Sequence, residues 1–95
     1  MKIVNFAEKN SELNRFVAEI RDIHIQQDRL RFRKNLERIG EVMSYEISKD
    51  FRYSEKLVTT PLGTARVNTA DDKIVIGTIL RAGIPYHQGF LNYFD

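Results

Sequence analysis

The sequence predicts an α/β fold, in which two N-terminal helices and a β-hairpin arm precede the first core strand of a parallel sheet. Three observations favour this fold. Apolar residues recur at spacings of three and four along the first half of the chain, as on one face of an α-helix. Two short β-prone stretches then flank a Pro-Leu-Gly turn, and a nearly continuous apolar run covers residues 73–80. Such a run is typical of a strand covered on both faces.

The first fifty residues are expected to form two helices. A helix over residues 11–23 begins after Asn10-Ser11, whose side chains suit an N-cap. A second apolar stripe recurs at i, i+4, i+7, i+11 and i+15 and comprises Phe32, Leu36, Ile39, Met43 and Ile47. Gly40 lies inside this second stripe and costs about 1 kcal/mol relative to alanine, which predicts a closely packed neighbour.

The chain then changes character. Lys56–Thr60 and Thr64–Asn68 flank the turn Pro61-Leu62-Gly63 and predict a hairpin with an exposed, half-polar face. A second turn at Ala70-Asp71-Asp72 precedes the predicted strand Lys73–Leu80, and Pro85 suits the first turn of a helix that follows.

The predicted strand has no parallel neighbour within the 95 residues. Parallel pairing requires a crossover of a dozen or more residues. Either other chains complete the sheet, or the chain is the front portion of a longer α/β protein, and we favour the second interpretation. We expect one domain portion over residues 1–95: a helical segment over 1–50, the hairpin arm over 51–70, and the strand, its loop and a helix over 71–95.

Composition excludes several classes of protein. The sequence contains no cysteine, which excludes disulfides, a cysteine zinc site and a thiol nucleophile. Fifteen Lys and Arg against 13 Asp and Glu give a net charge of +2, too small for a highly charged nucleic-acid tail. No apolar run is long enough to span a bilayer, and the N-terminal residues lack the apolar core of a signal peptide. We expect a soluble, cytoplasmic protein without a membrane partner.

The junction Arg81-Ala82-Gly83 is the first candidate site. Ligands of open α/β sheets bind beyond the carboxyl ends of strands, where loops lead into helix N-termini. A short loop there offers backbone amides and the positive end of a helix dipole, and Arg81 adds a forked cation that holds two phosphate oxygens. Gly83 allows close approach of a ligand or a positive φ. The alternative is an exposed arginine beside a glycine that ends the strand.

A basic cluster is the second candidate site, comprising Arg29, Arg31, Arg33, Lys34 and Arg38. Arg31, Lys34 and Arg38 would form a positive strip on one helix face, able to contact nucleic-acid phosphates. The alternative is a solvated face with Glu37 and Glu41 as partners, or a subunit interface. We favour this alternative, and expect no nucleic-acid partner, because no aromatic platform is interleaved with the basic residues.

The remaining titratable residues point to no site. His24 is expected at the edge of an apolar helix stripe, and His87 lies close to the loop without partners spaced as metal ligands. Asp71-Asp72 is explained by turn chemistry. We therefore propose no metal site and no catalytic acid–base pair in this sequence.

Several short segments together resemble uracil phosphoribosyltransferases. Thr78–Gly83 is similar to the family's Pro-Ile-Leu-Arg-Ala-Gly segment, and the hairpin around Thr60–Gly63 falls where the family has its β-arm. Ile20-Arg21-Asp22, Phe32-Arg33 and Tyr45-Glu46 resemble further family segments in the same order. The matches run from about Ile20 to Gly89.

The resemblance implies a phosphoribosyltransferase fold and a transferase activity in pyrimidine salvage. Such an enzyme joins uracil to 5-phospho-α-D-ribose 1-diphosphate (PRPP) and releases UMP and diphosphate, usually with Mg²⁺ bound through the PRPP diphosphate. Arg81, Ala82 and Gly83 would bind that diphosphate. The resemblance also implies a cis peptide bond between Leu80 and Arg81. We expect a homo-oligomer, because the predicted last strand and the aromatic helix from Tyr86 would expose apolar faces. The competing hypothesis is a non-catalytic nucleic-acid-binding or interaction module that uses the helix Arg29–Arg38.

The sequence departs from the family pattern in several places. Thr78 replaces the usual proline, and Ile84-Pro85-Tyr86 replaces a more common Leu-Gly-Met. The family's ribose-phosphate loop, ending in Ala-Thr-Gly-Gly, and its Gly-Asp-Ala uracil segment have no counterpart here. We therefore expect an amino-terminal part of the enzyme that is inactive by itself.

Overall fold

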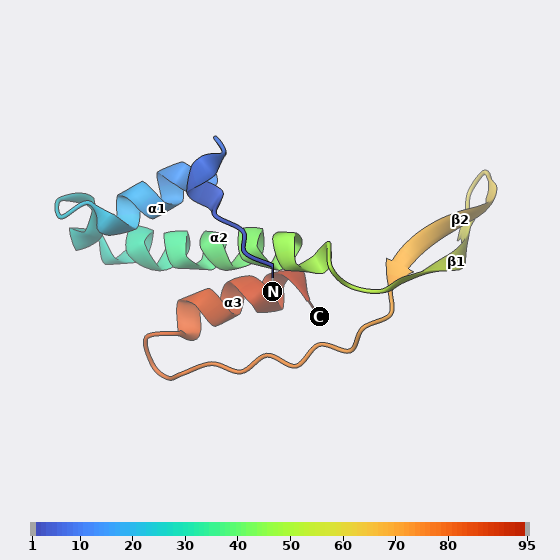
Figure 1. The fold of residues 1–95 in the computed structure, drawn as a ribbon. Coiled ribbons are helices and arrows are strands. Elements are labelled where there is room, and N and C mark those ends of the chain that lie inside the picture. The colour runs from blue at the N-terminus through green and yellow to red at the C-terminus, as the bar shows by residue number, and fades with distance from the viewer. Residues whose placement is uncertain (1, 95) are drawn as a thin grey trace.

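The computed structural model describes residues 2–94 and contains three α-helices and one antiparallel β-hairpin (Figure 1). The helices are α1 (Leu13–Arg21), α2 (Arg29–Ser48) and α3 (Ile84–Tyr93), and the strands are β1 (Tyr53–Thr60) and β2 (Gly63–Ala70). Short 3-10 turns, η1 (Phe6–Glu8) and η2 (Ile25–Gln27), precede α1 and α2. The helices and the hairpin confirm the α/β prediction. In the described part of the chain, no helix is long and apolar enough to cross a membrane.

The long helix α2 is the central element, with α1 and α3 packed along it (Figure 1). Its N-cap is Asp28, whose carboxylate accepts a hydrogen bond of 3.1 Å from the Arg31 amide. The first helix is shorter than the predicted span 11–23. It begins after Glu12, which makes no side-chain capping bond, so the prediction of Asn10-Ser11 as the cap is wrong. It ends at Arg21 because the Asp22 carboxylate accepts from the amides of His24 and Ile25 and starts the next turn.

Two glycines bring α2 and α3 together. A Cβ built on Gly89 would collide with the Glu37 carbonyl oxygen and lie 2.9 Å from the Gly40 Cα. A Cβ on Gly40 would collide with the Tyr86 carbonyl oxygen and lie 3.1 Å from the Gly89 Cα. The two helix backbones are therefore in direct contact, which confirms the close neighbour predicted at Gly40.

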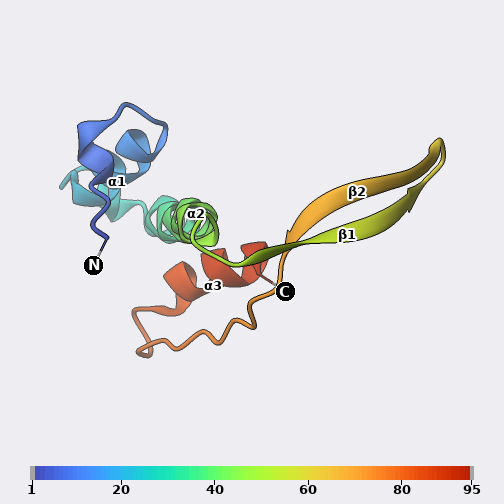
Figure 2. The same cartoon turned by 45° about the vertical axis from the view of Figure 1, so that its right-hand side comes forward.

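The hairpin projects away from the three helices (Figure 2). Its register pairs Tyr53 with Ala70 and Thr60 with Gly63, so Pro61 and Leu62 form a two-residue loop. Gly63 has a φ of 136°, a conformation that favours glycine. No residue of either strand is buried in the described structure.

The predicted core strand Lys73–Leu80 is not a strand in this structure. Residues 71–79 run extended but make no ladder, because neither strand among residues 2–94 pairs with them (Figure 1). The side chain of Val75 is 95% exposed and that of Ile79 is 87% exposed. The apolar run therefore has the composition of a buried strand but lacks backbone partners and cover within the described residues.

The chain exposes far more surface than a compact protein of its mass. Its accessible surface is 8039 Å² at 11.1 kDa, whereas a compact monomer of that mass exposes about 5,700 Å². Its radius of gyration is 16.8 Å, against about 12 Å for a compact domain of this length. Leu13 and Ile39 are the buried apolar residues among those described. The chain therefore leaves exposed many apolar side chains that a compact protein would bury.

We therefore expect the isolated 95-residue chain to be either oligomeric or poorly stable, since its exposed apolar side chains favour association. Sedimentation velocity combined with a thermal melt tests this. A monomer that melts in one sharp cooperative transition would contradict the expectation.

The glycine contact generates a second prediction. Gly40→Ala and Gly89→Ala should each lower the free energy of unfolding by about 1–3 kcal/mol, because overpacking of backbone against backbone outweighs the gain in helix propensity. The midpoint of the loss of helical circular dichroism in urea measures the effect. Gly77→Ala is the matched control, since its Cβ would have no neighbour within 4 Å. Equal midpoints for all three variants would contradict the prediction, because they would show that a Cβ in the contact between α2 and α3 does not lower the stability.

Candidate functional site

The loop between the extended segment and α3 covers Leu80–Gly83, and its Leu80–Arg81 peptide bond is cis. The cis bond agrees with the expectation from the resemblance. The Gly83 amide donates to the Ile79 carbonyl at 3.1 Å, and the Ile84 amide donates to the Arg81 carbonyl at 3.2 Å. The loop is therefore a closed turn that leads directly into α3.

Gly83 is required by the turn for a different reason from the ones predicted. Its φ is −76°, so it does not use the left-handed region. A Cβ at this position would lie 2.5 Å from the Thr78 hydroxyl and 2.7 Å from the Ile79 carbonyl oxygen. The absence of a side chain lets the loop close onto the segment that precedes it, whereas the sequence suggested close approach of a ligand.

The backbone amides of the loop divide into two pairs. Those of Gly83 and Ile84 donate within the turn and are therefore not offered to a ligand. Those of Arg81 and Ala82 donate no hydrogen bond within residues 2–94. Pro85, in the first turn of α3 as predicted, has no amide to offer. The amides that remain for an acceptor are thus next to the arginine side chain.

Arg81 is exposed and forms no ion pair with any described residue. With Ala82, Ile84 and Pro85 it lines a cavity of about 430 Å³. The opposite wall comes from α2 and comprises Phe32, Arg33 and Leu36. The cavity therefore lies between the loop and the central helix, with apolar walls and two guanidinium groups.

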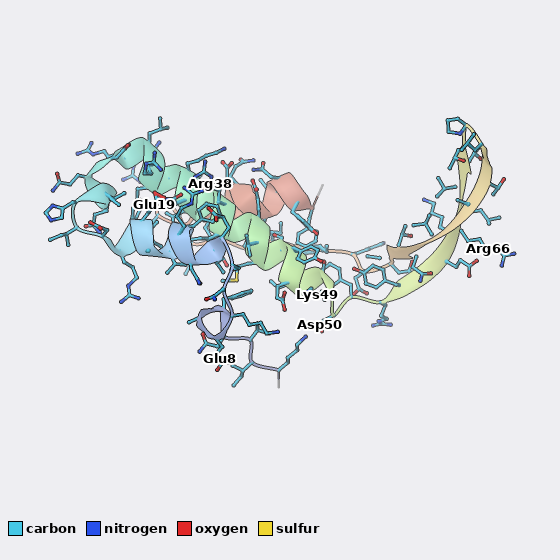
Figure 3. All side chains as sticks on the ribbon, turned by 90° about the horizontal axis from the view of Figure 1, so that it is seen from above. Glu8, Glu19, Arg38, Lys49, Asp50 and Arg66 are labelled. Carbon is cyan, nitrogen blue, oxygen red and sulfur yellow. The ribbon has the colours of Figure 1, made fainter. Side chains whose placement is uncertain are left out.

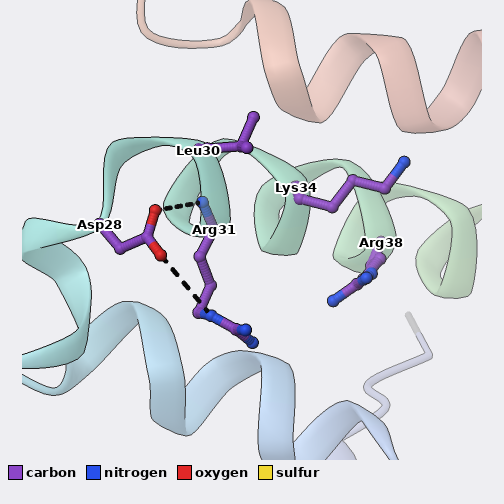
Figure 4. Close-up of a pocket in the computed structure, with 5 residues that line it drawn as sticks. All are labelled: Asp28, Leu30, Arg31, Lys34 and Arg38. Atoms are coloured by element: carbon purple, nitrogen blue, oxygen red, sulfur yellow. Dashed lines mark hydrogen bonds and ion pairs between the residues drawn. The ribbon is translucent and has the colours of Figure 1, made fainter.

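Two of the five cations in the basic cluster on α2 are paired with carboxylates, and Figure 4 shows the contact of Arg31 with Asp28. Arg31 lies 3.0 Å from the Glu19 carboxylate and 3.9 Å from that of Asp28. Lys34 pairs with Glu37 at 3.1 Å. Arg38, which is labelled in Figure 3, donates to the Asn35 side chain at 3.2 Å, and its guanidinium is 5.3 Å from the centre of the Phe16 ring. The nucleic-acid hypothesis for this cluster stays a prediction that the ion pairs do not favour.

Glu19 links α1 to α2 from a buried position. Its carboxylate accepts from Arg15 at 3.3 Å and from Arg31 at 3.0 Å. Burial opposes its ionisation, but hydrogen bonding and charge from Arg31, with charge from Arg15, outweigh this and lower the pKa of Glu19. The ionised carboxylate therefore stabilises the folded state.

The two histidines and the Asp71-Asp72 pair lie outside the cavity that Arg81 lines. His24 is exposed beyond the end of α1, so its predicted place on the helix stripe is wrong. His87 has a buried Nδ1 with no hydrogen-bond partner in the described structure. Asp71 accepts from the Ser54 hydroxyl at 2.7 Å, and Asp72 accepts from the Arg52 amide at 3.1 Å. Both carboxylates thus fix the base of the hairpin.

Residues 2–94 contain no group of three or more His, Asp or Glu side chains that could hold a metal ion. The cavity beside Arg81 is lined by two arginines and no carboxylate. Mg²⁺ prefers oxygen ligands, above all carboxylates, so these side chains do not fit a directly bound Mg²⁺. They fit an anion.

A closed loop that leads into a helix N-terminus beside an unpaired arginine offers donor groups of the kind that bind phosphate. Comparison with known proteins identifies the family. A family model described as uracil phosphoribosyltransferase matches residues 7–95, and the chain belongs to this family.

One of the relatives matches the whole chain, and two others match most of it. A uracil phosphoribosyltransferase of Porphyromonas gingivalis is 58% identical over all 95 residues, which is 44% of its own length. One from Pyrococcus furiosus is 36% identical over 81 residues, or 83% of this chain and 34% of its own. One from Methanococcus maripaludis is 35% identical over 74 residues, or 76% of this chain and 32% of its own. The chain thus spans less than half the length of these curated relatives.

The pKa of Glu19 generates a testable prediction. Its folded pKa is below the unfolded value of about 4.3, so the stabilisation is complete above that value and is lost as pH falls through the folded pKa. Glu19→Gln should destabilise the chain at neutral pH, and the difference from wild type should shrink at acid pH. Urea denaturation of helical circular dichroism at several pH values measures this.

Glu12→Gln is the control, because Glu12 is exposed and pairs with Arg15 at the surface. It should change the stability little at any pH. A Glu19→Gln curve that runs parallel to the wild-type curve down to pH 3 would contradict the assignment.

Proposed function

We propose that the chain is part of a uracil phosphoribosyltransferase that transfers the phosphoribosyl group of PRPP to uracil and releases UMP and diphosphate. Membership of the family supports this reaction, and the observation that carries the site is Arg81, exposed and unpaired at the cavity next to the closed loop. In this proposal the diphosphate of PRPP is bound by Arg81, Ala82 and Gly83. The cellular role is pyrimidine salvage in the cytoplasm.

The chemistry of the loop is electrostatic. As the bond from the ribose to uracil forms, the bond to the diphosphate breaks and negative charge grows on the departing group. The Arg81 guanidinium can donate two parallel hydrogen bonds to phosphate oxygens, and the unpaired amides of Arg81 and Ala82 can donate two more. Donors that are already in place when the charge develops lower the barrier without rearranging.

Mg²⁺ is proposed to enter with the donor, bound through its diphosphate, because no carboxylate lines the cavity to hold it. A homo-oligomer is proposed because exposed apolar side chains such as Val75 and Ile79 favour association with other protein. Neither proposal changes the role assigned to the loop.

The activity is best tested in a chimera, in which this chain replaces the matching stretch of the Porphyromonas gingivalis relative. We expect the chimera to form UMP from uracil and PRPP. Arg81→Ala should weaken PRPP binding in isothermal titration roughly tenfold to a hundredfold and lower kcat/KM by about 10²–10³. Affinity for uracil should change little.

Arg29→Ala is the matched control, since Arg29 is an exposed cation on α2 that does not line the cavity. It should leave both substrates' kinetics close to those of the parent. If Arg81→Ala retains the PRPP affinity and turnover of the parent, the diphosphate-binding role of the loop is wrong.

A further inference from the structure

Arg33 has no partner side chain in the described structure, unlike three other cations of the basic cluster. Arg31 and Lys34 are paired with carboxylates, and Arg38 is bonded to Asn35. Arg33 forms neither an ion pair nor a side-chain hydrogen bond within residues 2–94, and it is exposed. It is also the only member of the cluster that lines the cavity containing Arg81. Its charge is therefore available at that cavity.

The cavity brings two unneutralised cations from distant parts of the sequence to one surface. Arg33 comes from the first half of α2, and Arg81 from the loop before α3. No carboxylate is among the lining residues. Two like charges that share a partly enclosed space repel each other, and an anion between them reverses that cost. The lining therefore selects an anion that can accept from two guanidinium groups.

The two guanidinium groups and the apolar walls of the cavity define the class of anion. Each guanidinium presents a fork that matches two oxygens of one phosphate, so two forks match two phosphoryl groups better than one. The walls contributed by Phe32, Leu36 and Pro85 are apolar, so the two guanidinium groups are the charged groups of the lining. A diphosphate supplies one phosphoryl group for each of them.

We propose that Arg33 is a second diphosphate-binding residue, which holds the anion from α2 while Arg81 and the loop amides hold it from the other side. This inference rests on the function proposed above and adds a residue to its site. It also gives a role to the contact of Gly40 with Gly89, since that contact sets the spacing of α2 from α3 and of Arg33 from the loop.

The test measures the binding of inorganic diphosphate to the chimera described above by isothermal titration. Arg33→Gln should weaken diphosphate binding roughly tenfold to a hundredfold, the effect of losing a charged hydrogen-bond donor. Arg33→Lys, which keeps the charge but not the fork, should fall between the parent and Arg33→Gln. In steady-state kinetics the KM for PRPP should rise and the KM for uracil should stay unchanged.

Arg29→Gln is the matched control, because it removes the same charge from the same helix outside the cavity. It should change diphosphate affinity less than twofold. Thermal unfolding of each variant verifies that the fold is retained, which is expected for substitutions of exposed side chains.

Two outcomes would overturn the inference while leaving the proposed function intact. One is diphosphate binding by Arg33→Gln equal to that of the parent, with a loss only in Arg81→Ala. The other is an equal loss in Arg33→Gln and Arg29→Gln, which would indicate a general effect of charge. A folded chimera that binds no diphosphate would overturn both proposals.

Discussion

The direct contact between the backbones of α2 and α3 is the constraint on which the candidate site depends. It exists because Gly40 and Gly89 carry no side chains, so the Cα atoms of two helices approach as closely as helices can. The loop Leu80–Gly83 is joined to the first turn of α3 by hydrogen bonds from the Ile84 amide to the Arg81 carbonyl and from the His87 amide to the Gly83 carbonyl. The glycine pair therefore sets the distance between the loop and α2, and with it the cavity that the two elements share.

The cations on α2 fall into two groups, those paired with carboxylates and those without such a partner. The carboxylates of Asp28, Glu19 and Glu37 neutralise two of the cations, and the ion pair of Glu19 with Arg31 joins α1 to α2. Arg33 and Arg81, which share a cavity, have no such partners in the described structure. On α2, Arg31 thus forms ion pairs that hold the fold, whereas Arg33 is left unpaired at the cavity.

The helices, the hairpin and the candidate loop could be predicted from the sequence because each rests on local information. The spacing of Phe32, Leu36 and Ile39 predicts α2, and Pro61-Leu62-Gly63 predicts the turn. The strand predicted over 73–80 is not formed, because an apolar composition favours a buried strand but cannot supply the backbone partners, which are absent among the described residues. Periodicity also could not reveal the role of Asp22, whose side chain ends α1 early.

The site was predictable only on the loop side. Arg81, Ala82 and Gly83 lie together in the sequence, whereas Arg33 reaches the same cavity only through the packing of α2 on α3. No sequence signal singled it out. Glu37 lies four positions after Arg33, a spacing that predicts an ion pair, and only the structure shows that Glu37 pairs with Lys34 instead.

The length of α2 has a consequence for how the molecule responds to change. Twenty helical residues extend about 30 Å, so the cation cluster near its start and the root of the hairpin beyond its end lie at opposite extremes of one stiff rod. Energetic effects at sites farther apart than about 10 Å usually add. Sequence variation in the arm can therefore accumulate without altering the chemistry at the other end of the rod.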